Sequence, residues 1–247
     1  MRVADPRRFR RTLAVLLVTA AVVVTIASTL TGNDSSADPG SRVLDLAAPL
    51  VTGSPEPQVL ARHESVTLLV PIGQDALTGV AYHAVEGSRA TSLVPVGEQI
   101  NAGLLDRVVG HLFGDDGGGL RYWVADDSTQ AVDVGAPAGT EVYSPTTGVV
   151  VAITPYLLNG DKHGSIIGIQ PYANPSVVVN VAHVDLRTKV DGSPAIEIGD
   201  RAVGGTTLLG TIVDLEGVVE TGLSRFVSDA GNNVSITVEP APALQSP

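Results

Sequence analysis

The stretch VDVGAPAGTEVYSPTTGVVVAI, residues 132–153, shows the pattern that decides the fold. Runs rich in valine, a residue enriched in strands, are separated here by turn residues such as Pro-Ala-Gly at 137–139. Many short strands separated by such turns predict an all-β fold, either a compact sandwich or a partly open barrel. Further turn signals continue the pattern toward residue 239, at NGD (159–161), DGSP (191–194) and AVGG (202–205).

Strand-like segments occur on both sides of this stretch. They are short runs of apolar and β-branched residues bounded by Gly, Pro, Asn or Asp, which is the usual signature of strands. The predicted strands are residues 66–71, 79–85, 91–96, 120–125, 131–134, 141–144, 148–153, 165–170, 177–184, 206–213 and 233–239.

One soluble segment has a different period. In EQINAGLLDRVVGHLF, residues 98–113, apolar residues recur at spacings of three and four, which predicts an amphipathic helix. We therefore expect residues 61–128 to form an N-terminal β-rich extension with a helix over 98–113. Residues 129–240 are expected to form the main β domain, and the Pro-rich tail 241–247 is expected to be frayed.

The first thirty residues predict a membrane anchor. Residues 1–11 form a basic head with five arginines against one acid, Asp5, and the nineteen residues 12–30 carry no charge. A helix of that length measures about 29 Å, close to the ~30 Å hydrocarbon core of a bilayer. The arginines favour the cytoplasmic side, so the N-terminus is expected inside the cell and the C-terminal part outside.

A cleaved signal peptide is the alternative interpretation of the same segment. Its apolar region usually spans about 7–15 residues and ends in a small-x-small site, which Ala27-Ser28-Thr29 matches poorly. Residues 31–60, which begin TGNDSSADPGS, are rich in Pro, Gly, Ser and Asp, so we expect a flexible linker there.

Charge and composition exclude several function classes. Residues 1–30 hold five of the 15 basic residues and one of the 26 acidic residues, so the remainder is strongly acidic. An acidic surface is unsuited to nucleic acid, because phosphate binding needs basic groups. The chain has no cysteine, so disulfides and thiolate metal sites are excluded.

Five segments between residues 129 and 239 follow one another in a defined order: VDVGAPAGTEVYSPTTGVVVAI (132–153), HGSIIGIQ (163–170), VNVAHV (179–184), VDGSPAIEIGDRAVGGTTLLGTI (190–212) and NVSITVE (233–239). Taken together, they resemble the core of the LytM and lysostaphin-type metallopeptidases. The resemblance covers less than half of the chain. It implies a compact β-sandwich with an open groove, in a family whose active members cut peptide cross-bridges of bacterial peptidoglycan.

The resemblance also implies a zinc site, most of which this chain has replaced. In active members the ligands are a histidine four residues before an aspartate, that aspartate, and the second histidine of a His-x-His pair. The first histidine of the pair and the histidine of a Tyr-x-His motif assist. Asp133 and His183 keep the aspartate and Tyr-x-His positions, whereas Thr129, Ser235 and Thr237 stand where the three other histidines belong.

A catalytic zinc needs about three protein ligands plus a water, and Ser and Thr hydroxyls are poor zinc ligands. We therefore expect no metal and no other cofactor. Asp133, His183, Thr129, Ser235 and Thr237 are expected to be remnants of a binding groove. Asp133 could also simply bond backbone amides at a turn, and His183 could be a satisfied core residue.

The other histidines and the remaining motifs add no site. We expect His63, His83, His111 and His163 to be packed or solvated side chains without a functional role. The sequence contains no Gly-x-Ser-x-Gly, no His-Glu-x-x-His and no phosphate loop. Neither of its two lysines, Lys162 and Lys189, has the Met-Lys-Met setting of a biotinyl carrier domain.

Together, these observations predict a single-pass membrane protein that carries a degenerate LytM-like domain outside the cell membrane. Such a domain, without its zinc, would bind cell-wall peptide or regulate an envelope hydrolase. Two alternatives stay open: an active zinc endopeptidase acting on peptidoglycan, and a structural envelope protein.

Overall fold

Strands dominate the part of the chain that the computed structural model describes, which is residues 54–102, 119–188, 195–216, 218, 221–227 and 231–242. The fold is all-β, as the sequence predicts, and these ranges contain no α-helix. The strands are β1 (Val59–His63), β2 (Val66–Leu69), β3 (Gly79–His83), β4 (Val94–Pro95), β5 (Glu98–Gln99), β6 (Arg121–Val124), β7 (Ala131–Gly135), β8 (Glu141–Tyr143), β9 (Gly148–Leu158), β10 (Asp161–Pro171), β11 (Val177–Leu186), β12 (Arg201–Ala202), β13 (Leu208–Ile212) and β14 (Asn233–Pro240). Two short 3-10 helices, η1 (Gln74–Ala76) and η2 (Gly222–Arg225), complete the elements.

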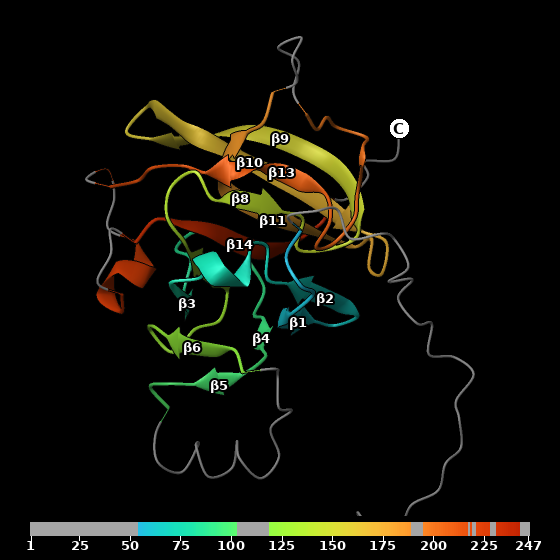
Figure 1. Cartoon of the computed structure of the whole chain (residues 1–247). Helices are drawn as coiled ribbons and strands as arrows, with labels where there is room; N and C mark the ends of the chain where they lie inside the picture. Colours follow the sequence, from blue (N-terminus) through green and yellow to red (C-terminus); the bar gives the residue numbers. More distant parts are fainter. Residues whose placement is uncertain are drawn as a thin grey trace, which may run out of the picture. The chain divides into compact units, whose positions relative to one another are not determined.

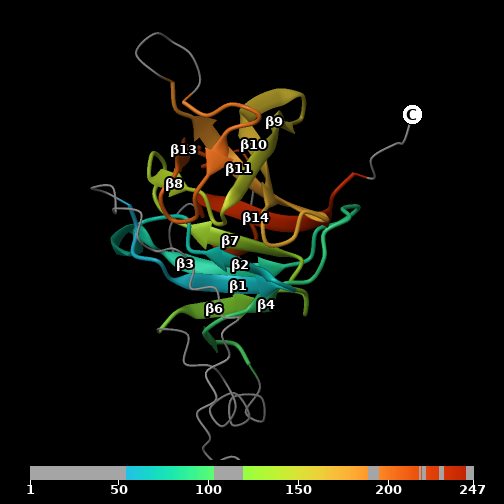
Figure 2. The same cartoon turned by 90° about the vertical axis from the view of Figure 1, so that its right-hand side faces the viewer.

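The strands form one large sheet and one small sheet. The order along the large sheet is β12-β9-β10-β11-β14-β7-β3-β6-β5. Figure 1 labels β9, β10, β11, β14, β3, β6 and β5 of this sheet. β13 also pairs with β11, and β8 pairs with β13, so the large sheet branches at β11. The small sheet has the order β2-β1-β4. β14, β7 and β3 are hydrogen-bonded neighbours and lie side by side in Figure 2.

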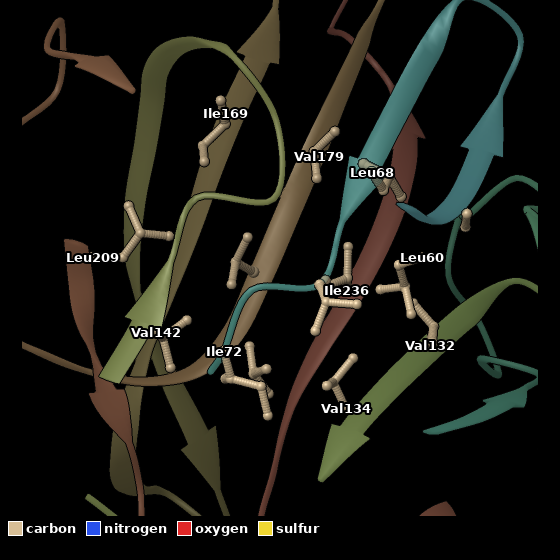
Figure 3. Close-up of a cluster of buried hydrophobic side chains, with 14 of the residues drawn as sticks. Leu60, Leu68, Ile72, Val132, Val134, Val142, Ile169, Val179, Leu209 and Ile236 are labelled. Carbon is tan, nitrogen blue, oxygen red and sulfur yellow. The ribbon is translucent and has the colours of Figure 1, made fainter. Parts of the chain in front are cut away.

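The core lies on one face of the central strands. Alternation along β7, β14 and β11 sends one set of valines and isoleucines to this face, because successive side chains of a strand point to opposite sides. Residues of β1, β2, β8 and β13 pack against it, which gives the two-layer arrangement in which both apolar faces are buried. Figure 3 shows Leu60, Leu68, Ile72, Val132, Val134, Val142, Ile169, Val179, Leu209 and Ile236 gathered in this core.

The two expected parts, residues 61–128 and 129–240, share this large sheet. β3 and β6 come from the expected extension 61–128, yet β3 pairs with β7 from the expected main domain. The described residues also fall in one compact unit, Leu50–Pro247. β1 begins at Val59, and Leu60 is fully buried, so folded structure starts inside the segment that we expected to be a linker.

The predicted helix over 98–113 is wrong at its start. Glu98–Gln99 form β5, because Gly97 adopts a φ of +123° and the backbone amides of Glu98 and Ile100 donate to the carbonyls of Leu120 and Tyr122. Pairing with β6 therefore overrides a helical period that is weak in these first residues. Residues 103–113 lie outside the described part of the chain.

The predicted membrane-spanning segment 12–30 and the basic head 1–11 also lie outside the described residues. Among the residues that are described, no helix is long and apolar enough to cross a membrane.

The core predicts a clear contrast between two leucines. Leu209 on β13 is 0% exposed, whereas Leu157 on β9 is 56% exposed. We expect Leu209→Ala to lower the free energy of unfolding by about 2–5 kcal/mol, because it removes buried methyl groups and leaves a cavity. Leu157→Ala is the matched control and should change it little. Urea unfolding of the full chain measures both, and equal effects would contradict this core.

Candidate functional site

A polar face lies opposite the core on the neighbouring strands β3, β7 and β14. Alternation places Ala81 and His83 of β3, Asp133 of β7, and Asn233, Ser235 and Thr237 of β14 away from the apolar cluster that holds Val80, Tyr82, Val132, Val134, Val234 and Ile236. Polar and titratable side chains thus gather on one surface because each strand has a period of two.

Asp133 stands at the middle of this face. Its cross-strand partners are Ala81 on β3 and Ser235 on β14. The residue is only 3% exposed. A buried carboxylate is strongly destabilising unless a positive charge or hydrogen-bond donors compensate it. The structure must therefore supply Asp133 with a partner.

That partner is His83, for which the sequence predicted no role. His83 Nε2 lies 3.2 Å from Asp133 Oδ1, and the two side chains are 21% and 4% exposed. Although this distance makes the contact an ion pair, neither atom has a hydrogen bond of standard geometry. The two atoms face each other as close, buried polar neighbours.

The contact of the other ring nitrogen, Nδ1, helps to establish whether His83 is charged. Its Nδ1 lies 2.7 Å from the carbonyl oxygen of Ala84, which can only accept, so Nδ1 carries a hydrogen. The Asp133 carboxylate, against the opposing effect of burial, raises the pKa of His83 to about 9, and Asp126 adds a smaller contribution. His83 is therefore protonated at neutral pH and neutralises Asp133.

His183 reaches the same face through an irregularity in β11. Val181 and Val184 both point into the core, and the pairing of β10 with β11 shifts register between them. His183 has a φ of +65°, which is uncommon for a residue other than glycine and marks a bulge that turns the side chain to the opposite face. At this point β11 changes partner, from β14 at Ala182 to β13 at Val184.

Two neighbours hold the imidazole of His183. Its Nδ1 lies 2.9 Å from Asn233 Oδ1, and the ring packs edge-on to Tyr156 of β9 at a centroid distance of 4.6 Å. Burial lowers the pKa of His183, against the opposing effects of Asp133 and Asn233. Burial, followed by the charge of Asp133, raises the pKa of Tyr156. A neutral His183 thus lies close to the His83–Asp133 ion pair.

The segment around η2 covers this cluster. Leu223 is fully buried against Gly79 and Gly135, where a Cβ on Gly135 would come within 2.4 Å of the leucine. Phe226 stacks on Trp123 of β6. Gly222 lies directly over the ion pair, since a Cβ there would be 3.4 Å from His83 Cδ2 and 3.6 Å from Asp133 Oδ2. This cover accounts for the burial of Asp133.

The other predicted site residues are only partly brought together. Ser235 lies directly across from Asp133, and Thr237 is its diagonal neighbour, paired with Ala131 and Asn180. Thr129 does not join them. Its hydroxyl donates to the carbonyl oxygen of Leu93 at 2.7 Å, and its own carbonyl accepts from the Leu93 amide.

Three residues of the cluster were missed from the sequence: His83, Asn233 and Tyr156. His83 is fifty residues before Asp133, so only the pairing of β3 with β7 joins them. Asn233 could have been found from the sequence. It is two residues before Ser235 and four before Thr237, so the three side chains share one face of β14. Tyr156 lies on a long hairpin strand, and no local pattern relates it to His183.

The residues present do not fit the catalytic zinc ion that the resemblance implies. Asp133 Oδ1 and His83 Nε2 are buried and face each other, and both belong to residue types that bind zinc. A third protein ligand is needed, and no group of three or more His, Asp or Glu side chains within the described ranges is arranged to hold a metal ion. No hydrolytic step through zinc follows from this arrangement.

Comparison with known proteins assigns no family to the chain. No family model, no curated protein and no solved structure matches it. The resemblance to the LytM and lysostaphin-type metallopeptidases therefore depends on the five ordered segments alone.

The His83–Asp133 pair predicts a specific pH dependence of stability. The folded pKa of His83, about 9, lies above the unfolded value of 6.5, so its contribution is complete below pH 6.5 and is lost as the pH rises through 9. We expect the free energy of unfolding of the full chain to fall across this window. His83→Gln should flatten the fall, which denaturant titrations at a series of pH values can measure.

His163→Gln, on the β9–β10 hairpin, is the matched control and should leave the pH dependence as it is. The depressed pKa of His183 acts in a different window, because it reduces stability only as the pH falls below 6.5. A His83→Gln variant with the same fall between pH 6.5 and 9 as the unmodified chain would contradict the ion pair.

Proposed function

We propose that the chain is a membrane-anchored, LytM-like module that binds cell-wall peptide without cutting it. One observation supports this above all: the face that carries Asp133 and His183 is a buried polar cluster closed by an internal His83–Asp133 ion pair. The chain keeps the arrangement of a reaction site but neutralises its carboxylate from within.

The geometry offers a consistent match to the family positions. The ligand of the family's His-x-His pair must lie near the aspartate, and Ser235 is the residue opposite Asp133. The assisting histidine two residues earlier then corresponds to Asn233, which contacts His183 at the other assisting position. This match moves the pair from Ser235 and Thr237, as the sequence analysis had it, to Asn233 and Ser235.

The same match argues against hydrolysis. Serine at position 235 and asparagine at position 233 replace both imidazoles, and neither can substitute for a histidine as zinc ligand or proton carrier. The carboxylate of Asp133 is also covered by the η2 segment, so water and substrate have little access to it. A binding role needs neither zinc nor access to Asp133.

The surface that we propose for the peptide is the outer edge of β9 beside Tyr156. β12 covers this edge at Gly148 and Val149, and Gly199 and Asp200 bond to the backbone of Val150. No other described strand pairs with the edge beyond Val150. Leu157 is exposed there, next to the ring that contacts His183. An extended peptide can add to a free strand edge through its backbone. Amino groups on such a peptide suit the acidic composition of the chain.

Membrane anchoring is the second part of the proposal. The uncharged residues 12–30 and the five arginines before them would hold the folded part outside the cell membrane, where peptidoglycan is found. An envelope hydrolase is the alternative partner for the outer edge of β9. It would also lie outside the cell membrane.

Peptide binding can be tested with soluble stem peptides released from peptidoglycan. We expect the purified full chain to bind them and to release no new amine, with or without added zinc. Tyr156→Ala should weaken binding by roughly tenfold, because it removes an aromatic side chain at the proposed edge. Tyr172→Ala removes a tyrosine that lies outside β9 and is 56% exposed; it is the control and should bind as the unmodified chain does.

The alternatives have distinct outcomes in the same assays. Stoichiometric zinc in the unmodified chain, lost in Asp133→Ala together with hydrolysis, would establish the endopeptidase. Absence of binding to peptidoglycan fragments, combined with no effect on the activity of envelope hydrolases, would leave the structural envelope role.

Topology has its own test. A periplasmic-type reporter fused after Pro247 should be active, because the arginines retain the N-terminus in the cytoplasm and the apolar segment carries the rest across. Replacing Arg7, Arg8, Arg10 and Arg11 with glutamate should reduce this activity. A reporter that is active only in its cytoplasmic form would overturn the anchoring proposal.

A further inference from the structure

The outer side of β9 is a long strand edge that is open over most of its length. Its last backbone bonds to a described neighbour join Val150 to Gly199 and Asp200. Along residues 152–158, β9 pairs with β10 on its inner side, and no described strand covers the outer side. An edge of this kind offers backbone donors and acceptors to any other chain that can lie beside it.

Apolar side chains make this edge more prone to association. Val151 and Leu157 lie on β9 and are 37% and 56% exposed. Ile198, next to the glycine that bonds to Val150, is 64% exposed. A long, exposed and apolar edge strand pairs with further copies of its own chain unless the sequence blunts it. A feature that keeps a second copy away from β9 is therefore expected on the strand itself.

The register of β9 shows which of its backbone groups face outward. Val150 faces outward, because its amide and its carbonyl make the bonds described above. One extra residue, Val151, lies opposite the step from Ile169 to Gly168, so the alternation of β9 changes phase at this bulge. Beyond the bulge, the residues whose amide and carbonyl positions face outward are Ile153, Pro155 and Leu157.

Pro155 occupies the middle of these three positions and is exposed. Proline has no backbone N–H, so the edge lacks the donor that a partner strand would use at this point. Ile153 and Leu157 keep their donors on either side. A short ligand can bond to the edge on one side of Pro155, whereas any extensive antiparallel overlap of two β9 strands includes it.

We propose that Pro155 selects against a second copy of this chain at the outer edge of β9. In a two-fold pairing, the proline of each copy would leave a carbonyl of the other copy without its donor. The acidic composition of the chain adds repulsion between the copies. This inference concerns the same edge as the proposed function, but it does not depend on which ligand binds there.

The test is the self-association of Pro155→Val in the full chain, held in detergent micelles and followed by analytical ultracentrifugation. Valine restores the donor and suits a strand. We expect the dimer dissociation constant to be at least roughly tenfold lower than that of the unmodified chain, because each copy regains a hydrogen bond. Pro175→Val changes an exposed proline between β10 and β11, and this matched control should associate no more than the unmodified chain does. Pro155→Ala restores the same donor if the valine variant does not fold.

Two further variants locate the contact. The chain has no cysteine, so Thr154→Cys adds a single thiol, and mild oxidation should link two chains in the Pro155→Val background only. Adding Leu157→Lys to Pro155→Val should reverse the gain, because like charges then meet at the shared edge.

The proposal is overturned if folded Pro155→Val and Pro155→Ala both associate no more than the unmodified chain. It is also overturned if Thr154→Cys links two chains equally well with Pro155 in place. Because self-association is measured without peptide, failure of the peptide-binding proposal would be a separate result.

Discussion

The constraint on which the structure depends is the two-residue alternation of β3, β7, β14 and β11. Each of these strands sends most of its valines and isoleucines to one face and its polar or small residues to the other. A shift of one residue in any pairing would expose the apolar set and bury the polar one, so the register is strongly specified. The core and the polar cluster are consequences of the same register.

One residue departs from this alternation, and it is the one that completes the cluster. A regular β11 would point His183 into the core between Val181 and Val184. The bulge, with its positive φ, turns the ring to the polar face instead, where Asn233 and Tyr156 hold it. Strained backbone of this kind persists where the surroundings require it, and here the branching of β11 between β14 and β13 provides that requirement.

Burial of Asp133 explains why the cluster is closed rather than open. Leu223 packs into the space that Gly79 and Gly135 leave, and Gly222 comes close enough to cover the carboxylate. A buried ion pair is weak evidence for stability, because desolvation opposes the attraction between the charges. Its effect is more specific: a protonated imidazole supplies the positive charge that a bound cation would otherwise bring.

The sequence by itself determined the all-β class and most strand positions, because these depend on local alternation and turn residues. It also singled out Asp133 and His183, which the structure places in the buried polar cluster. It did not reveal that Glu98–Gln99 pair as a strand or that Val59 begins β1, because pairing with distant strands decides both. Only the tertiary structure joined His83 to Asp133, placed Asn233 against His183 and removed Thr129 from the site. The physical reason is that hydrogen bonding between β3, β7, β14 and β11 juxtaposes residues fifty or more positions apart, and no spacing along the chain encodes such contacts.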